Sequence, residues 1–71
     1  MTLRHLKIFV AVCETGSATA AGEKLFIAQP SISLAIAELE DHYGIKLFDR
    51  ISKRLQITET GKHFLQYTTH I

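Results

Sequence analysis

The spacing of apolar residues predicts a helix at the start of the chain. Apolar side chains recur there at the i, i+3 and i+4 intervals that mark one face of a helix. The residues of this face are Leu3, Leu6, Phe9, Val10 and Cys13. Thr2 can cap the start of such a helix, and Gly16 supplies the left-handed residue that commonly ends one. We therefore expect a first helix between Thr2 and Gly16.

Two further helices are expected in the next part of the chain. Ser17 offers a second N-cap, and the alanine-rich stretch 18–25 favours a short helix that approaches its neighbours closely. Pro30 stands where a first helical turn tolerates proline, so a third helix is expected over 29–43, with Gly44 at its end. The apolar stripe of this third helix consists of Ile32, Ile36, Leu39 and Tyr43.

The period of the pattern changes beyond Gly44. Leu55 and Ile57 alternate with a polar residue, and 45–48 is a short β-prone run. Two short strands or extended arms are therefore expected, with the polar and basic segment 52–54 as the tip of a hairpin. No Asn-Gly or Gly-Gly pair fixes the type of turn at this tip.

A fourth helix is expected after Thr58. Thr58 can cap it, and Glu59 suits its electropositive first turn. The apolar side of this helix consists of Phe64, Leu65 and Ile71. A helix this short, with the β-branched Thr68 and Thr69, is marginal alone, so we expect it to continue into something longer or to pair with another chain.

Length and composition limit the class of protein. With 71 residues, of which 46% are hydrophobic, and no low-complexity run, the chain is expected to form one domain with one small core. No apolar run approaches the roughly 20 residues that a membrane span requires. The N-terminus lacks the pattern of a secretory signal. We therefore expect a cytoplasmic protein that makes no contact with membranes.

Side chains that could carry catalysis or hold a metal are sparse. Cys13 is the single cysteine, so it forms no internal disulfide, and it is expected to be a buried, inert thiol. His63 and His70 can share a helix face, but no third ligand accompanies them. His5 and His42 are expected on solvated faces. With no nucleophile–base pair and no glycine-rich phosphate loop, we expect neither an enzyme nor a cofactor- or metal-binding protein.

The distribution of charge is more informative than the net charge of +1. A domain that binds nucleic acid is usually strongly basic. Between residues 46 and 62, five cations stand against Asp49 and Glu59. These cations are Lys46, Arg50, Lys53, Arg54 and Lys62. The preceding helix ends in the acidic segment 38–41, so a basic half is expected to face an acidic patch. Charge alone is equally consistent with an ordinary solvated surface.

Three helices followed by a basic hairpin form the layout of a winged helix-turn-helix, mainly α with a small β-hairpin wing, whose third helix enters the major groove of DNA. The first turn of that helix presents N–H groups that suit phosphate. Gln29 can pair bidentately with adenine, and Ser31 and Ser33 can serve a base edge or a phosphate. Helix capping is the alternative role of these three side chains. The tip residues Lys53 and Arg54 would reach phosphates or a narrow minor groove.

The same segments resemble a known family. Over essentially its whole length the chain is similar to the DNA-binding domain of the LysR-type transcriptional regulators. The matching parts are 2–7 with Phe9, Gly16-Ser17, Ala21 with 23–25, 29–33, Leu39-Glu40, Gly44, Leu47-Phe48, Arg50, and Thr58-Glu59 with Gly61. Each part alone is weak, whereas their order and spacing together are specific.

The resemblance implies sequence-specific binding of double-stranded DNA by a bacterial repressor or activator. It implies a winged helix-turn-helix over 1–57, with a three-helix core, and over 58–71 the start of a linker helix through which two copies form a homodimer. A small-molecule effector is expected to bind only a C-terminal domain beyond this chain. The residues expected at DNA are Ser17, Thr19, Gln29, Pro30, Ser31, Ser33, Leu34, Arg50, Lys53 and Arg54.

Four positions depart from the family pattern. Leu34 stands where the family usually has Arg or Lys, and Ala20 stands where Arg is common. Ala18 and Ala28 replace a common Phe and a common Ser. Because two potential DNA contacts are lost, we expect weaker binding with a shallower salt dependence than in typical relatives. Leu34 lies about 200° around the helix from Ile32, so it is not expected in the core. Contact with a thymine methyl group and a neutral surface position are both open interpretations of it.

A winged helix that contacts another protein is the main alternative, because the net charge is low. In that case the 52–54 tip and the Gln29 end of the third helix would bind a partner protein. A phosphate-contacting surface loses affinity steeply as salt rises, whereas an apolar protein interface need not. Salt dependence therefore separates the two functions.

Overall fold

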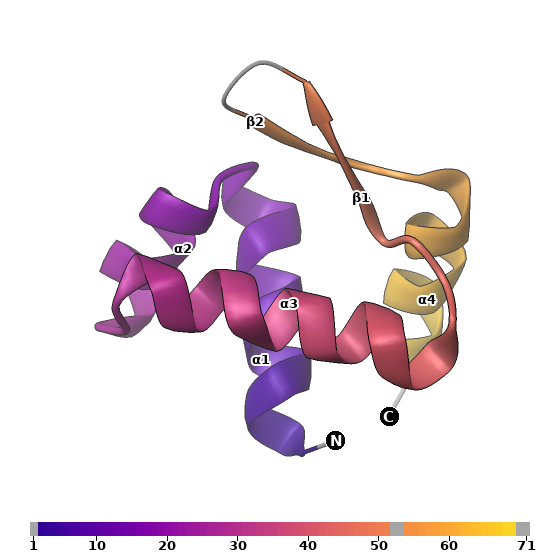
Figure 1. Cartoon of the computed structure of the whole chain (residues 1–71), viewed down its shortest axis with the longest axis horizontal. Coiled ribbons are helices and arrows are strands. Elements are labelled where there is room, and N and C mark those ends of the chain that lie inside the picture. Colours follow the sequence, from indigo (N-terminus) through magenta and orange to yellow (C-terminus); the bar gives the residue numbers. More distant parts are fainter. Residues whose placement is uncertain (1, 52–53, 70–71) are drawn as a thin grey trace.

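The computed structural model describes residues 2–51 and 54–69, which form four helices and a two-stranded antiparallel hairpin (Figure 1). In chain order the elements are α1 (Leu3–Thr15), α2 (Ala18–Leu25), α3 (Gln29–Tyr43), β1 (Phe48–Ile51), β2 (Arg54–Ile57) and α4 (Glu59–Thr69). Helices α1, α2 and α3 pack together, and the hairpin rises beyond them with its outer end toward α2 (Figure 1). This arrangement confirms the predicted winged helix-turn-helix.

The core lies where the three helices meet the base of the hairpin. Phe9 has no exposed surface, and its ring lies 5.5 Å from that of Phe48 and 5.1 Å from that of Phe64. One α1 side chain therefore joins β1 and α4. The other large side chains that are fully buried are Ile8, Val12, Ile32, Leu39 and Leu47. Burying a side chain of this size stabilises the fold by about 1.5–3 kcal/mol, so this cluster holds the elements together.

The predicted apolar face of α3 is buried except at its end, whereas the predicted face of α1 is only partly right. In α1 the buried residues are Ile8, Phe9, Ala11 and Val12, and of the predicted face only Phe9 is among them. Ile32, Ile36 and Leu39 of the α3 stripe are buried. Tyr43 keeps 41% of its surface exposed and rests its ring 5.0 Å from that of Phe64, which suits an aromatic ring with a polar tip. Leu3, in the first turn of α1, is exposed and does not belong to the core.

Glycine and serine end and begin the helices as predicted. Gly16 and Gly44 close α1 and α3 with φ angles of 74° and 64°, a left-handed conformation that glycine adopts without a steric penalty. Ser17 caps α2, because its hydroxyl accepts a hydrogen bond from the Ala20 N–H over 3.2 Å. The start of α2 is therefore set by the local sequence.

The two threonines predicted as caps behave differently. The Thr58 hydroxyl accepts a hydrogen bond from the Gly61 N–H over 2.9 Å and caps α4, as expected. Thr2 occupies the N-cap position of α1, but its hydroxyl lies 2.9 Å from Nδ1 of His5 and makes no bond to a backbone N–H. The start of α1 therefore lacks the predicted side-chain cap.

The turn between α2 and α3 is tight. Phe26 ends α2 in the left-handed conformation, with φ of 58°, and is 96% exposed. The Ile27 N–H donates to the Gly22 carbonyl over 2.8 Å. A Cβ atom on Gly22 would lie 2.5 Å from the carbonyl oxygen of Ile27, so only glycine allows the turn to come this close to α2. The turn before α3 is thereby packed directly against α2.

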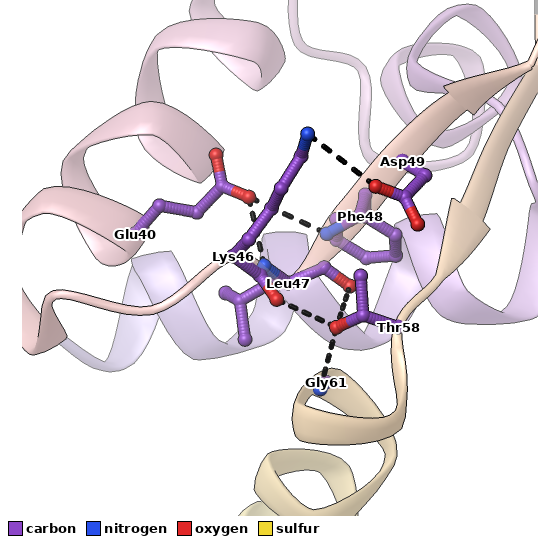
Figure 2. Close-up of polar contacts among 7 residues, drawn as sticks. All are labelled: Glu40, Lys46, Leu47, Phe48, Asp49, Thr58 and Gly61. Carbon is purple, nitrogen blue, oxygen red and sulfur yellow. Dashed lines mark hydrogen bonds and ion pairs between the residues drawn. The ribbon is translucent and has the colours of Figure 1, made fainter.

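A carboxylate from α3 holds the segment that leads into the hairpin. Oε2 of Glu40 accepts hydrogen bonds from the N–H groups of Leu47 and Phe48, at 2.8 and 3.3 Å (Figure 2). On the other side, the Leu47 carbonyl accepts a bond from the Thr58 N–H over 2.9 Å. The Thr58 hydroxyl donates to the Lys46 carbonyl over 2.6 Å (Figure 2). These bonds join the last turns of α3 to the segment before β1, and that segment to the start of α4.

The predicted first strand was misplaced. The strand was expected over 45–48, but β1 begins at Phe48, whose partner is Ile57, and continues to Ile51 opposite Arg54. The backbone just before Phe48 bonds to Glu40 and Thr58, so it cannot pair with another strand. Arg54 consequently belongs to β2, not to the hairpin tip, and the rest of the predicted tip lies outside the described residues.

Candidate nucleic-acid interface

A polar hollow lies between the start of α2, the start of α3 and the hairpin. We call it the notch; its lining residues are Ser17, Ala18, Thr19, Gln29, Ser33, Arg50, Arg54 and Leu55. Its volume is about 90 Å³, well below the roughly 300–1,000 Å³ of small-molecule pockets. The notch is therefore shaped to receive an edge or a single group of a larger partner.

The notch brings together six of the ten residues predicted at DNA, namely Ser17, Thr19, Gln29, Ser33, Arg50 and Arg54. Pro30, Ser31 and Leu34 are exposed on α3 but do not line it. Lys53 lies outside the described residues. Segments separated by more than thirty positions in the sequence thus form one continuous surface.

The start of α2 supplies two hydroxyl groups to the notch. The Ser17 hydroxyl is occupied as a helix cap, so its first role is structural. Thr19 is exposed in the first turn of α2. The positive end of the α2 dipole lies in the same place and favours a negatively charged group there.

The start of α3 is arranged differently. Ala28 occupies the N-cap position and offers no side-chain acceptor, while Pro30 lies within the first turn. Gln29 and Ser33 are one turn apart, and Nε2 of Gln29 donates to Oγ of Ser33 over 2.8 Å. Leu34 keeps 61% of its surface exposed, which confirms that it is not a core residue.

The hairpin brings two arginines to the notch. Arg50 stands opposite Leu55 and Arg54 stands opposite Ile51 in the strand register. Both arginines are exposed, and neither forms an ion pair within residues 2–51 and 54–69. Since an arginine guanidinium matches phosphate geometry bidentately, these two side chains are available to an anionic partner.

The other described cations of the basic half are paired locally. Lys46 lies 3.4 Å from Asp49, and Lys62 lies 3.2 Å from Glu59. Such exposed pairs contribute little to stability. They concentrate the available positive charge at the two hairpin arginines.

The predicted acidic patch is only partly present, because Glu38 and Asp41 are exposed beside one surface hollow whereas Glu40 is turned into the fold. Oε1 of Glu38 lies 3.2 Å from Nε2 of His5 on α1, so this histidine is not simply solvated as expected. Glu40 points toward the start of β1, as described above. Glu38 and Glu40 therefore serve contacts within the fold, and among the described residues no carboxylate lines the notch.

The single cysteine is not an activated nucleophile. Cys13 is half-buried; burial, with a smaller effect of neighbouring Glu14, raises the pKa of its thiol to about 11. A thiol with so high a pKa is a poor nucleophile at neutral pH. In residues 2–51 and 54–69, no group of three side chains could hold a metal ion, and no helix is long and apolar enough to span a membrane.

The sequence did not indicate two features of this region. Leu55 was predicted only as a strand residue, but it lines the notch opposite Arg50. Glu40 was predicted as part of a surface patch, but it sets the point at which the hairpin leaves α3. The alternation of apolar residues around Leu55 could have indicated which face of the hairpin turns inward.

The fold matches solved structures closely. A DNA complex of BenM_DBD with benA site 1 superimposes with a TM-score of 0.92 at 47% identity, covering 99% of this chain and 79% of that chain. A CbnR_DBD–DNA complex gives a TM-score of 0.94 at 34% identity and covers 99% of this chain and 80% of that one. Each of those two domains was therefore solved bound to DNA.

Sequence relatives point the same way. The HTH-type transcriptional regulator BenM of Acinetobacter baylyi is 49% identical over 67 residues, which is 94% of this chain and 22% of that protein. The RuBisCO operon transcriptional regulator of Allochromatium vinosum is 38% identical over 71 residues, covering 100% of this chain and 24% of that protein. This chain thus spans less than a quarter of the length of either curated relative. A family model described as bacterial regulatory helix-turn-helix protein, lysR family, matches residues 3–62.

Proposed function

This chain belongs to the lysR family of bacterial regulatory helix-turn-helix proteins, and we propose that it binds double-stranded DNA sequence-specifically by inserting the first turn of α3 into the major groove. The observation that carries the proposal is the notch, which gathers on one surface the starts of α2 and α3 and two arginines without an ion pair among the described residues. That surface combines groups that suit phosphates with groups that suit base edges.

The first turn of α3 supplies the base contacts. Gln29 is exposed at the tip of the helix and can meet adenine with one donor and one acceptor. Ser31 and Leu34 are exposed on the same helix. A hydroxyl can bond to a base edge, and a leucine methyl can contact the methyl group of thymine. Pro30 has no backbone N–H, so at this position the first turn has no donor that would need a partner.

The hairpin and the start of α2 supply the phosphate contacts. Arg50 and Arg54 border the notch opposite the first turn of α2, and Thr19 and the α2 dipole favour negative charge at that turn. Lys53, between the two strands in sequence, would extend the contact to the neighbouring backbone or minor groove. Contacts of this kind fix the register of the protein on DNA without reading its sequence.

The chain divides into two functional segments in this proposal: residues 1–57 bind DNA, and residues 58–71 begin a linker helix that pairs two copies. On α4, Phe64 and Leu65 pack partly against the core, whereas Tyr67 is 70% exposed. An exposed aromatic side chain on a short helix suits contact with a second apolar surface. A dimer would bind two half-sites about one helical turn apart, or a multiple of this distance.

A regulator of this kind would act in the cytoplasm, where bacterial DNA lies. A small-molecule effector would bind a further domain, as the family resemblance implies. These assignments, like the residue roles, rest on the family and on the surface described above.

The salt dependence of duplex binding tests the proposal. A duplex selected from a random library by the chain itself is titrated between about 50 and 200 mM salt, where phosphate-dependent binding weakens steeply. Arg54→Ala should weaken binding to every sequence and flatten the log–log slope by about 0.9. Lys7→Ala is the matched control, because Lys7 is an exposed cation that lines a separate hollow with Leu3 and Leu6.

Two results would overturn the proposal. If Arg54→Ala and Lys7→Ala changed DNA affinity and the salt slope equally, the notch would not be part of the DNA interface. Absence of salt-dependent duplex binding in the parent chain would favour the protein-binding alternative.

The same titration examines Leu34. If this position has lost a phosphate contact, Leu34→Arg should tighten binding and steepen the slope by about 0.9. Unchanged affinity and slope would show that Leu34 does not account for weak binding.

A further inference from the structure

The exposed amide of Gln29 is held by its own helix. Nε2 of Gln29 donates to Oγ of Ser33 over 2.8 Å, four residues further along α3. Residues at this spacing lie one above the other on a helix face, so the contact is local and needs no other element. Ser33 is half-buried and lines both the notch and a second hollow against the hairpin with Ile36 and Phe48.

The bond to Ser33 uses one N–H of the Gln29 amide and leaves one donor and the acceptor free. A glutamine amide has two N–H donors and one carbonyl acceptor. With one N–H directed back to Ser33, the other N–H and Oε1 stand side by side and can face outward. Adenine presents the complementary pair in the major groove, with N7 as acceptor and the N6 amino group as donor. Guanine presents two acceptors there and cannot satisfy Oε1.

We propose that Ser33 is a positioning residue that fixes the Gln29 amide for adenine, and so sets the base preference of α3 at one position. The inference rests on the proposed DNA binding of the same surface. A free glutamine side chain samples many rotamers, and their loss on binding opposes recognition. Ser33 holds one arrangement before DNA arrives. Its hydroxyl proton can still donate to a base or phosphate.

The test compares base preference at one position. Fluorescently labelled duplexes carry the sequence selected by the parent chain, with each base pair of the half-site varied in turn. The position read by Gln29 is the one where Gln29→Ala reduces the preference for A·T most. At that position, Ser33→Ala should lower the preference for A·T over G·C by about five- to tenfold, out of the roughly 5- to 150-fold that a bidentate pair provides. Ser33→Thr retains the hydroxyl and should keep the preference.

A double-mutant comparison separates positioning from direct contact. In the Gln29→Ala background, Ser33→Ala should change the preference at this base pair no further, because the two residues act as a unit. Thermal unfolding of the variants shows whether each is folded. Full A·T preference in Ser33→Ala would overturn the inference, and so would an equal loss with and without Gln29. Failure of the proposed function is distinct, since the parent chain itself would then select no duplex.

Discussion

The starts of α2 and α3 border the same notch but are held in place by different means. At α2, the Ser17 side chain caps the helix and the preceding Gly16 turns the chain. At α3, Ala28 provides no cap, and the position of the helix start follows from the close contact of the turn with Gly22. The first end is therefore set by a side-chain hydrogen bond, and the second by backbone packing.

This difference matters for recognition. The proposed reading residues are on α3, whose first turn keeps its side chains directed toward a partner or toward one another, as with Gln29 and Ser33. The start of α2 is proposed to contact phosphates, and such contacts depend on the positive end of the helix dipole more than on a particular side chain. Changes at the two ends should therefore differ in size and in consequence.

The largest effect is expected for Gly22→Ala. The added Cβ would lie 2.5 Å from the Ile27 carbonyl oxygen and 3.6 Å from the Gln29 nitrogen, so the turn would have to move. Overpacking costs about 1–3 kcal/mol and alanine returns up to about 1 kcal/mol of helix propensity. We expect a net loss of about 2 kcal/mol in the free energy of unfolding, measured by urea denaturation. DNA affinity should fall as well, because the start of α3 would shift.

Glu23→Ala is the matched control for this change, since Glu23 is exposed on the same helix next to Gly22. It should leave the free energy of unfolding within about 0.5 kcal/mol of the parent. If Gly22→Ala unfolded at the same urea concentration as Glu23→Ala, packing would not determine the start of α3.

A smaller effect is expected for Ser17→Ala. The substitution leaves the Ala20 N–H without its side-chain acceptor, and the loss of an N-cap typically costs about 1 kcal/mol. Thermal unfolding should show a corresponding decrease in the midpoint, of about 4–8 °C for a domain of this size. Ser17→Asp restores an acceptor and should recover the stability. Loss of stability in both variants would mean that the cap is not what holds α2.

The two ends also differ in how far the sequence predicts them. Ser17 and Gly16 act through neighbours in the chain, so their roles follow from local rules. The left-handed Phe26 does not follow from such rules, because tertiary packing of the turn overrides the preference of the residue. Glu40 bonds to N–H groups seven and eight positions away, which only the assembled fold reveals.

The candidate interface shows the same division. The resemblance and the helix pattern predict Gln29, Ser33 and the hairpin cations as one surface, and the notch joins those that lie in the described residues. Their contacts with DNA stay a prediction. Which side chains hold one another, such as Gln29 and Ser33, depends on rotamers that sequence spacing does not specify.

The smallest effect is expected for Ala28→Ser, which gives α3 the kind of cap that α2 has. Ala28 already has the extended backbone of an N-cap residue, with φ of −62° and ψ of 140°, so a serine can enter without backbone movement. Because Pro30 and the packed turn already fix this end, we expect a gain of only about 0.5 kcal/mol in the free energy of unfolding, below the typical value of a cap. Base preference should be unchanged, since Gln29 and Ser33 keep their contact. A gain as large as the loss in Ser17→Ala would show that the start of α3 is also limited by its missing cap, and the contrast between the two ends would disappear.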